Sequence, residues 1–288
     1  AKDKSHILKV NKPIEVLFEG VNLNVFKKIK QFSNTELKKT IESIPEKFAF
    51  LTVGHWMQGE MGHDRKNIGL TIKAFYEIFK DKPEKPALIL KTCAVGGSNI
   101  DKAEMLRRIK LIRETVNSKD IPNVYLLHGD FTDIEMNEIY NNPRIKAMIS
   151  LTKGEGFGRP LLEFSTLNKP IIVPGWSGHI DFLKKENCAL LGGELEKVHQ
   201  SAQVKDMILA EAHWFKVGDK WIDNAYQDVF YNYKSWKEKS KKQGFYSRKN
   251  FSYNKMKTLI QVILDKSIPE LPKKMELKLP SMSKIQMP

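Results

Sequence analysis

The stretch Lys153-Gly154-Glu155-Gly156-Phe157-Gly158-Arg159-Pro160-Leu161-Leu162-Glu163, KGEGFGRPLLE in one-letter code, places three glycines and two carboxylates in eleven residues. It follows the apolar run KAMISLT and leads into RPLLEFSTL, so we expect a loop between a buried strand and a helix. Glycines in such a loop permit positive φ angles and let the backbone approach a ligand closely. Amides at the helix start, with their partial positive charge, suit a phosphate or a sugar oxygen. By itself, the stretch is equally compatible with an ordinary glycine turn.

The order of strand, loop and helix recurs on both sides of this stretch. Helical spacing of apolar residues separates the strand-like runs, for example at Ile68, Ile72, Phe75 and Phe79. Strands that alternate with helices require parallel pairing, so we predict an α/β fold: a Rossmann-like doubly wound sheet of about six strands with helices on both faces. Ligands of such sheets bind at the carboxyl ends of the strands. The strand-like runs are FAFLTVG (48–54), ALILKT (87–92), NVYLLHG (123–129), KAMISLT (146–152), KPIIVPG (169–175) and CALLGG (188–193).

The same pattern predicts three regions along the chain. Residues 1–46 are expected to be a connector with one short strand at IEVLFEG, Ile14 to Gly20. Residues 47–266 form the Rossmann-like domain, which we expect to become helical past Gly193. Residues 267–288 contain four prolines and are expected to be an extended or unstructured tail.

Composition narrows the setting in which the protein works. No run of about 18 apolar residues occurs, and the N-terminus lacks the apolar stretch of a signal peptide. Cys93 and Cys188 are far apart and have no ligand-like spacing with histidines, which argues against a structural zinc and a disulfide scaffold. We therefore expect a cytoplasmic protein.

The formal charge of +14 favours a phosphorylated or polyanionic partner. Much of the charge lies between Tyr233 and Lys257, where aromatic residues alternate with lysines. One interpretation is a solvated helix face followed by a loop; another is peripheral attraction to an acidic membrane surface. Nucleic acid is a weaker candidate, because no sequence motif of a known nucleic-acid-binding domain accompanies the charge.

Two carboxylates of the opening stretch suggest a specific ligand. Glu155 lies in the loop and Glu163 about one turn into the helix. Since a carboxylate beside a phosphate would be repelled, we expect Glu163 to accept hydrogen bonds from ribose hydroxyls and Glu155 to face a reacting sugar. The alternative for Glu163 is a solvated helix glutamate.

A second candidate cluster, GHWMQGEMGHDRKNIG, spans Gly54 to Gly69 on another strand-to-helix loop. Its Arg65 and Lys66 stand just before the helix, at the same edge of the sheet as the acidic loop. An enzyme that releases a diphosphate needs cations where that charge grows. No Asp-x-Asp pair for a metal occurs in the chain, which leaves Arg65 and Lys66 as the cationic clamp, or as two ordinary surface residues.

Together these stretches resemble the C-terminal, donor-binding half of GT-B glycosyltransferases of the retaining family 4, or group 1, type. The resemblance covers about Phe48 to Lys266. It is carried by FAFLTVG with RKNIGLTIKAF, by NVYLLHGDFTDIEMNEIYNN, by GEGFGRPLLEFSTLNKPIIVPGWSGHIDFL with its Glu-x7-Glu pair, and by the closing FSYNKMKTLIQVIL.

The resemblance implies a role for each matched position. Arg65 and Lys66 would neutralise a nucleoside diphosphate, which the backbone approaches at Gly54. The amides of Gly156, Phe157 and Gly158 would hold the sugar and phosphate, with Glu155 near the sugar hydroxyls and Glu163 on the ribose. Phe131 and Asp133 would lie near the base. His55, Lys91-Thr92 and the long loop from His55 to Asp64 depart from the family pattern.

By this resemblance the chain would transfer a sugar from a UDP- or GDP-sugar to an acceptor glycan, lipid or protein, with retention and without a metal or other cofactor. Lys12 to Phe26 resembles the segment that leads out of the N-terminal, acceptor-binding half, so we expect that half to be missing here. The alternative is a noncatalytic binding or scaffolding module of the same fold that contacts membrane or polyanion.

Overall fold

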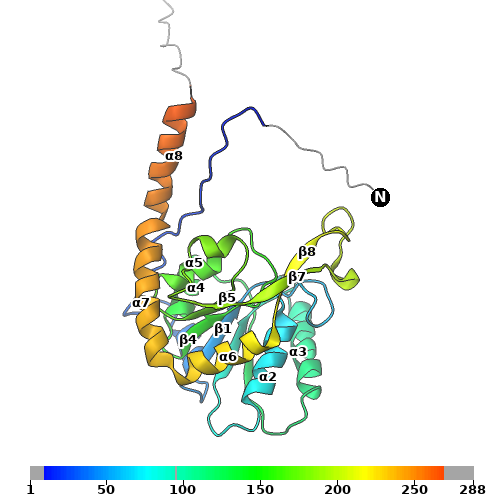
Figure 1. Cartoon of the computed structure of the whole chain (residues 1–288). Coiled ribbons are helices and arrows are strands. Elements are labelled where there is room, and N and C mark those ends of the chain that lie inside the picture. The colour runs from blue at the N-terminus through cyan, green and yellow to red at the C-terminus, as the bar shows by residue number, and fades with distance from the viewer. Residues whose placement is uncertain (1–9, 95, 269–288) are drawn as a thin grey trace, which may run out of the picture.

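A six-stranded parallel sheet forms the centre of the molecule (Figure 1). The computed structural model describes residues 10–94 and 96–268. The strand order is β3-β2-β1-β4-β5-β6, and every neighbouring pair is parallel, which confirms the predicted doubly wound sheet. The strands are β1 (Ala49–Val53), β2 (Ala87–Lys91), β3 (Val124–Leu127), β4 (Ile145–Ile149), β5 (Ile171–Pro174) and β6 (Ala189–Leu191).

Helices cover both faces of the sheet because alternate strand residues point to opposite sides. In β1, Phe50 belongs to one buried cluster and its neighbour Leu51 to the other. The first cluster is closed by α2 (Ile68–Phe79), α3 (Asn99–Glu114) and α6 (Asp219–Tyr231). The second is closed by α1 (Thr35–Glu42), α4 (Asp133–Asn141) and α5 (Arg159–Ser165).

The strand order reverses between β1 and β4, which pair directly at the centre of the sheet. The loop after β1 leads to α2 on one face, and the loop after β4 leads to α5 on the other. Such a switch point leaves a crevice at the carboxyl ends of the two strands, where doubly wound proteins bind ligands. Both candidate clusters of the sequence lie on these two loops.

The expectation that the chain turns helical past Gly193 is wrong up to Val217 and confirmed from Asp219 onward, where α6 begins. β7 (Gly193–Lys197) and β8 (His213–Val217) form an antiparallel pair, and the short helix η2 (Gln200–Ala202) lies in their connection. β7 has the sequence GELEK, with a single apolar side chain, so periodicity carries almost no strand signal. Tertiary contacts stabilise this pair of strands instead, since Phe215 of β8 stacks on Trp176.

The strand predicted for Ile14–Gly20 is also wrong. The segment contains no strand, and Val16 is 87% exposed. Only the next residue, Val21, makes a bridge, to Ser252. An apolar run becomes a strand when a neighbour pairs with it, and no strand lies beside this segment within the described part of the chain. The connector does contain a helix, α1.

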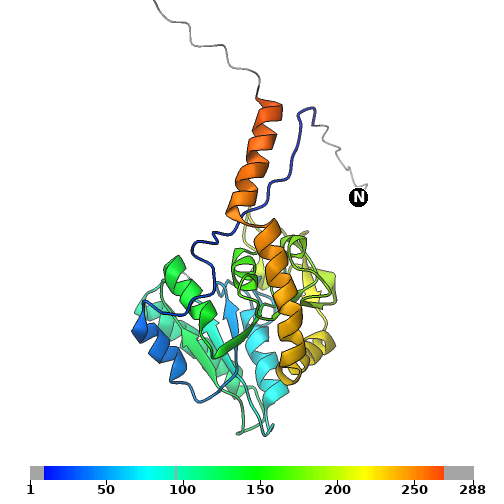
Figure 2. The same cartoon turned by 90° about the vertical axis from the view of Figure 1, so that its left-hand side faces the viewer.

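The basic C-terminal region forms two helices instead of a helix and a loop. α7 (Tyr233–Asn250) follows α6 after a break at Asn232, and two residues separate it from α8 (Tyr253–Ser267). Both views show α8 projecting from the sheet domain on the side where the N-terminal segment also leaves it (Figures 1 and 2). Of the predicted tail, residues 267–288, Ser267 is the last residue of α8, and the part from residue 269 onward lies outside the described residues.

Candidate functional site

A buried turn before α2 positions the two cations of the first loop. Asp64 is almost fully buried, and its Oδ2 accepts a hydrogen bond from the amide of Ile68 at 3.3 Å. Asn67 adopts a left-handed conformation with φ of 57°, which turns the chain into the helix. Arg65 and Lys66 lie between these two residues. Asp64 is a site residue that the sequence did not single out, because an aspartate before a helix is common.

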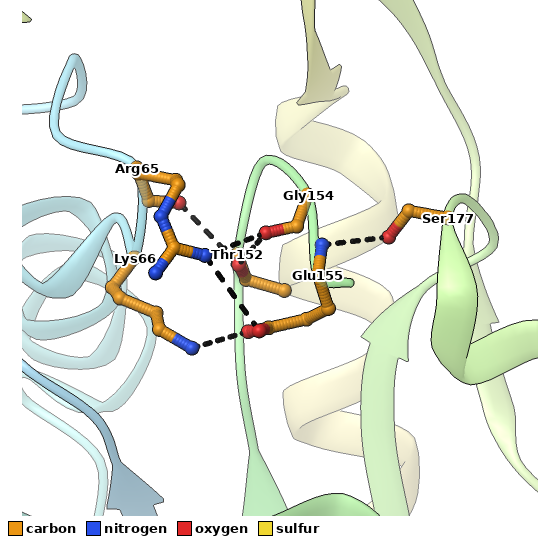
Figure 3. A network of polar contacts seen from close by, with 6 residues as sticks. All are labelled: Arg65, Lys66, Thr152, Gly154, Glu155 and Ser177. Carbon is orange, nitrogen blue, oxygen red and sulfur yellow. Dashed lines mark hydrogen bonds and ion pairs between the residues drawn. The ribbon is translucent and has the colours of Figure 1, made fainter. Parts of the chain in front are cut away.

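The glycine loop after β4 is tied directly to this first loop (Figure 3). The amide of Lys153 donates to the carbonyl of Arg65 at 2.8 Å, and Nη1 of Arg65 donates to the carbonyl of Gly154 at 2.9 Å. The Thr152 hydroxyl donates to the same Gly154 carbonyl at 3.1 Å. The two loops therefore form one rigid edge of the crevice.

Arg65, Lys66 and Glu155 converge on this edge, and we call them the charged triad. Nζ of Lys66 lies 2.5 Å from Oε1 of Glu155, and Nη1 of Arg65 lies 3.6 Å from Oε2 (Figure 3). The side chains of Lys66 and Glu155 are only 13% and 11% exposed, so water screens their attraction weakly. The expectation that the cations and the acidic loop share one edge is confirmed.

Glycines let the backbone pack tightly around the triad. Gly54 has φ of 159° and lies against the aliphatic part of the Lys66 side chain. Gly158, at the start of α5, has φ of 92°, a conformation that disfavours other residues. Among the described residues, no hydrogen bond takes up the amides of Gly156, Phe157 or Gly158.

The segment after β5 completes the loop; it is part of the motif that carries the family resemblance, but no role was predicted for its residues. The amide of Glu155 donates to Oγ of Ser177 at 2.9 Å, and Ser177 itself has φ of 75° (Figure 3). A Cβ on Gly178 would lie 2.0 Å from the carbonyl oxygen of Gly156, so only glycine fits there. The glycine in the sequence WSGH indicates a turn, but the sequence does not show that this turn packs against the glycine loop.

Glu163 is buried, which makes the solvated-helix alternative wrong. It is 5% exposed; Oε1 accepts from Nε of Arg159 at 2.9 Å and Oε2 from the Tyr140 hydroxyl at 3.2 Å. Burial raises its pKa to about 7, and Arg159 and Tyr140 oppose that shift. Neither partner was anticipated, although Arg159 stands four residues before Glu163, on the same helix face. The assignment of Glu163 to a ribose stays a prediction.

Asp133 and Phe131, the two residues predicted to lie near the base, contact different parts of the molecule. Asp133, at the start of α4, is 59% exposed and lies 3.6 Å from Arg159, which links it to Glu163. Phe131 packs against the core, and Nζ of Lys91 lies 5.7 Å from the centre of its ring. Phe157 also packs inward, 5.0 Å from Phe182 between ring centres, so that its backbone and not its ring faces the loop.

Two absences apply to residues 10–94 and 96–268. No three His, Cys, Asp or Glu residues there are grouped so that they could hold a metal ion. No helix in that part of the chain is both long and apolar enough to cross a membrane. Cys93 and Cys188 are both buried free thiols and form no disulfide with each other.

Comparison with known proteins gives no match in sequence and many in structure. No protein-family model and no curated protein sequence matches the chain. The C-terminal domain of LpcC, a glycosyl transferase group 1 family protein of Francisella tularensis, matches with a TM-score of 0.51 and 14% identity over 81% of this chain and 100% of that domain. Sucrose-phosphate synthase of Thermosynechococcus elongatus matches with a TM-score of 0.57 and 16% identity. Anabaena HepE, in complex with UDP-glucose, matches with a TM-score of 0.57 and 14% identity.

The chain has the fold of one half of a GT-B glycosyltransferase. It corresponds to the whole C-terminal domain of LpcC but to 51% of the synthase and 57% of HepE, while 86% and 88% of this chain are covered. The predicted GT-B half is therefore confirmed as a fold. At these identities the likeness concerns the fold alone, and the chemistry has to be argued from the triad.

Proposed function

We propose that this GT-B half is a glycosyltransferase domain that binds a nucleoside-diphosphate sugar in the crevice between β1 and β4. The observation that carries the proposal is the convergence of Arg65 and Lys66 with the glycine loop at the switch point of the sheet. Doubly wound sheets bind nucleotides at this place. HepE, which shares the fold, was crystallised with UDP-glucose, and this supports the same class of ligand here.

In the proposed complex, Arg65 and Lys66 contact the diphosphate and neutralise the charge that grows on it as the sugar leaves. The amides of Gly156, Phe157 and Gly158 hold phosphate and sugar oxygens, since no described residue uses them. Glu163 accepts hydrogen bonds from the ribose. Phe131 and Asp133 lie on the side of the base, and Gly54 allows the backbone to approach the diphosphate.

Glu155 changes partner in this proposal. Its carboxylate pairs with Lys66, so a diphosphate that binds the same cation displaces it. The displaced carboxylate then accepts hydrogen bonds from hydroxyls of the sugar. Arg65, which donates to the Gly154 carbonyl as well as pairing with Glu155, keeps the loop in place during this exchange.

We propose transfer with retention and without a metal. The bond between the anomeric carbon and the diphosphate oxygen breaks, a bond to the acceptor oxygen forms on the same face, and the acceptor proton passes to the diphosphate. Two fixed cations supply the charge that a metal bound by an Asp-x-Asp pair would supply, and no such pair occurs in the sequence. The acceptor would bind on a second domain that faces this edge, as the match to about half of the synthase and HepE suggests.

A thermal-shift screen with UDP, GDP, ADP and their sugars tests the proposal. A ligand at 100 times its dissociation constant stabilises a protein by about 2.7 kcal/mol. Calorimetry then compares Lys66→Ala and Glu163→Ala with Lys80→Ala, a control that removes a lysine at the far end of α2. Affinity that falls in the first two variants and not in the control supports the site; unchanged affinity in both rejects it. Release of the nucleotide from its sugar in the presence of acceptors separates an enzyme from a noncatalytic binding module.

A further inference from the structure

A second group of cations lies at the opposite ends of β4 and β5 from the proposed donor site. Lys146 is the second residue of β4, and Lys169 precedes β5 by two residues. At about 3.3 Å per residue, β4 separates this end from the charged triad by roughly 15 Å. We define the lysine cluster as Lys169 and Lys237 together with Lys28 and Lys146, the two lysines whose charges lower the pKa of both.

Specific hydrogen bonds bring the segments of the lysine cluster together. The amide of Ile29 donates to Oδ1 of Asn141 at 3.2 Å, which holds the N-terminal segment on the end of α4. Nζ of Lys169 donates to the carbonyl of Asn142 at 2.9 Å. The Ser240 hydroxyl of α7 donates at 2.9 Å to the carbonyl of the residue before Lys169. These hydrogen bonds and the parallel pairing of β4 with β5 therefore place the backbone segments that carry the four lysines beside one another.

The lysine cluster lacks an acidic partner in the described part of the chain. Within the described residues, none of the four lysines forms an ion pair. Glu238 favours the charged form of Lys237, but its Oε1 already lies 2.6 Å from Nζ of Lys241. Burial and then the neighbouring lysines lower the pKa of Lys237 to about 8 and that of Lys169 well below its usual range. The site thus gains from any anion that enters it.

Asn142, whose carbonyl Lys169 contacts, has a side-chain donor that is unsatisfied among the described residues. Asn142 is fully buried, and its Nδ2 has no hydrogen-bond partner in the described part of the chain. Its Oδ1 accepts from the amide of Arg144 at 2.9 Å, which fixes the orientation of the side-chain amide. Its carbonyl accepts from Lys169. A buried donor without an acceptor is costly, but this one is closed to solvent, so the lysines and not Asn142 are the groups that an entering anion would contact.

We propose that the lysine cluster binds a phosphate group. Phosphate carries up to two negative charges near neutral pH, offers several acceptor oxygens, and is bound by lysines as point charges. The group belongs either to a free phosphate or phosphorylated small molecule or to the headgroup of an anionic lipid. This site is separate from the donor site and does not depend on the proposed glycosyltransferase activity.

Thermal unfolding in inorganic phosphate, against sodium chloride of equal ionic strength, tests the proposal. The titrations use the Lys66→Gln background, so that phosphate at the charged triad does not contribute. We expect phosphate to raise the Tm, and Lys237→Gln to abolish most of that rise. Lys234→Gln, which removes an exposed lysine from the same helix, is the control and keeps the rise. No rise in phosphate, or an equal loss in both variants, overturns the proposal.

Vesicle sedimentation separates the two sources of phosphate. Vesicles of phosphatidylcholine with and without phosphatidic acid are mixed with the parent protein and the two variants. Sedimentation that requires phosphatidic acid and falls in Lys237→Gln, but not in Lys234→Gln, identifies a lipid headgroup. A phosphate-dependent rise in Tm without such sedimentation identifies a free phosphate. In the parent background, with Lys66 intact, Lys237→Gln and Lys234→Gln are both expected to bind UDP as the parent protein does, so this test can fail while the donor site stands.

Discussion

Nζ of Lys66 lies 2.5 Å from Oε1 of Glu155, although 89 positions separate the two residues in the sequence. The contact joins the loop after β1 to the loop after β4 at the point where the strand order reverses. It places a carboxylate on the cation that we assign to a diphosphate. The protein therefore supplies the negative charge that a bound ligand would replace, and this competition can be measured.

Glu155→Gln is expected to tighten the binding of UDP. The variant removes the carboxylate that competes for Lys66, and a gain of about 1 kcal/mol corresponds to roughly fivefold in affinity. Transfer or hydrolysis of a UDP-sugar is expected to fall, because Glu155 no longer accepts hydrogen bonds as an anion. Calorimetry with UDP and a nucleotide-release assay give the two numbers.

Glu77→Gln is the matched control for this prediction. Glu77 also pairs with lysines, Lys73 and Lys80, on α2, so the substitution changes the net charge equally. UDP affinity that is weaker in Glu155→Gln, or that rises equally in the control, would contradict the assignment of Glu155 as a competitor for the cation.

The raised pKa of Glu163 predicts that the stability of the protein depends on pH. Its pKa is raised from 4.5 to about 7 in the folded chain, so the folded state holds the proton more tightly than the unfolded state. The stabilisation from protonated Glu163 is thus fully present below pH 4.5 and is lost as pH rises through about 7. At about 1.4 kcal/mol per pKa unit, the loss amounts to roughly 3 kcal/mol.

Urea denaturation at several pH values compares the parent protein with Glu163→Gln. We expect the free energy of unfolding of the parent to fall relative to the variant between pH 4.5 and 7. Glu135→Gln serves as the control, since Glu135 is only partly buried and its pKa is lowered, first by the amide of Thr132. A constant difference between the parent and Glu163→Gln across this range would refute the raised pKa.

Gly178→Ala is expected to disturb the glycine loop. The added methyl group would lie 2.0 Å from the carbonyl oxygen of Gly156, so the loop has to move. Overpacking of this kind costs about 1–3 kcal/mol. Both Tm and UDP affinity should fall, whereas Gly96→Ala, where no atom lies within 4 Å, should change neither. Normal UDP affinity in Gly178→Ala would show that the loop is not part of the site.

Gln243 is expected to hold α7 on the domain. Its side chain is buried, accepts from the amide of Lys184 at 3.0 Å and donates to the carbonyl of Phe182 at 2.6 Å. Gln243→Ala leaves the amide of Lys184 and the carbonyl of Phe182 without their hydrogen-bond partner. It should lower the free energy of unfolding by roughly 2–4 kcal/mol. Gln261→Ala on α8 is exposed and should have little effect. Chemical denaturation measures both, and equal stability of the two variants would dismiss the role of Gln243.

The sequence predicted the sheet and missed the parts that lack a local signal. The run FAFLTVG predicts a strand, and the spacing of Ile68, Ile72 and Phe75 predicts a helix. Both predictions work because the buried residues of an element recur along the sequence with the period of a strand or a helix. β7, with one apolar residue, has no such period. The apolar run from Ile14 has a strand-like composition but no neighbour to pair with. Pairing is a property of distant segments and is therefore invisible in either stretch.

What the sequence by itself determined is the α/β architecture, the glycine loop between β4 and α5, and the placement of Arg65, Lys66 and Glu155 at one edge of the sheet. These follow from local periodicity and from the rule that parallel strands end at the same edge. The tertiary structure decided that Lys66 pairs with Glu155 and that Tyr140 and Arg159 bury Glu163. It also decided that the segments of the lysine cluster, whose lysines form no ion pair among the described residues, lie together at the other edge. Charges and hydrogen-bond partners carry no period along the chain, so only the packing of distant segments determines which of them meet.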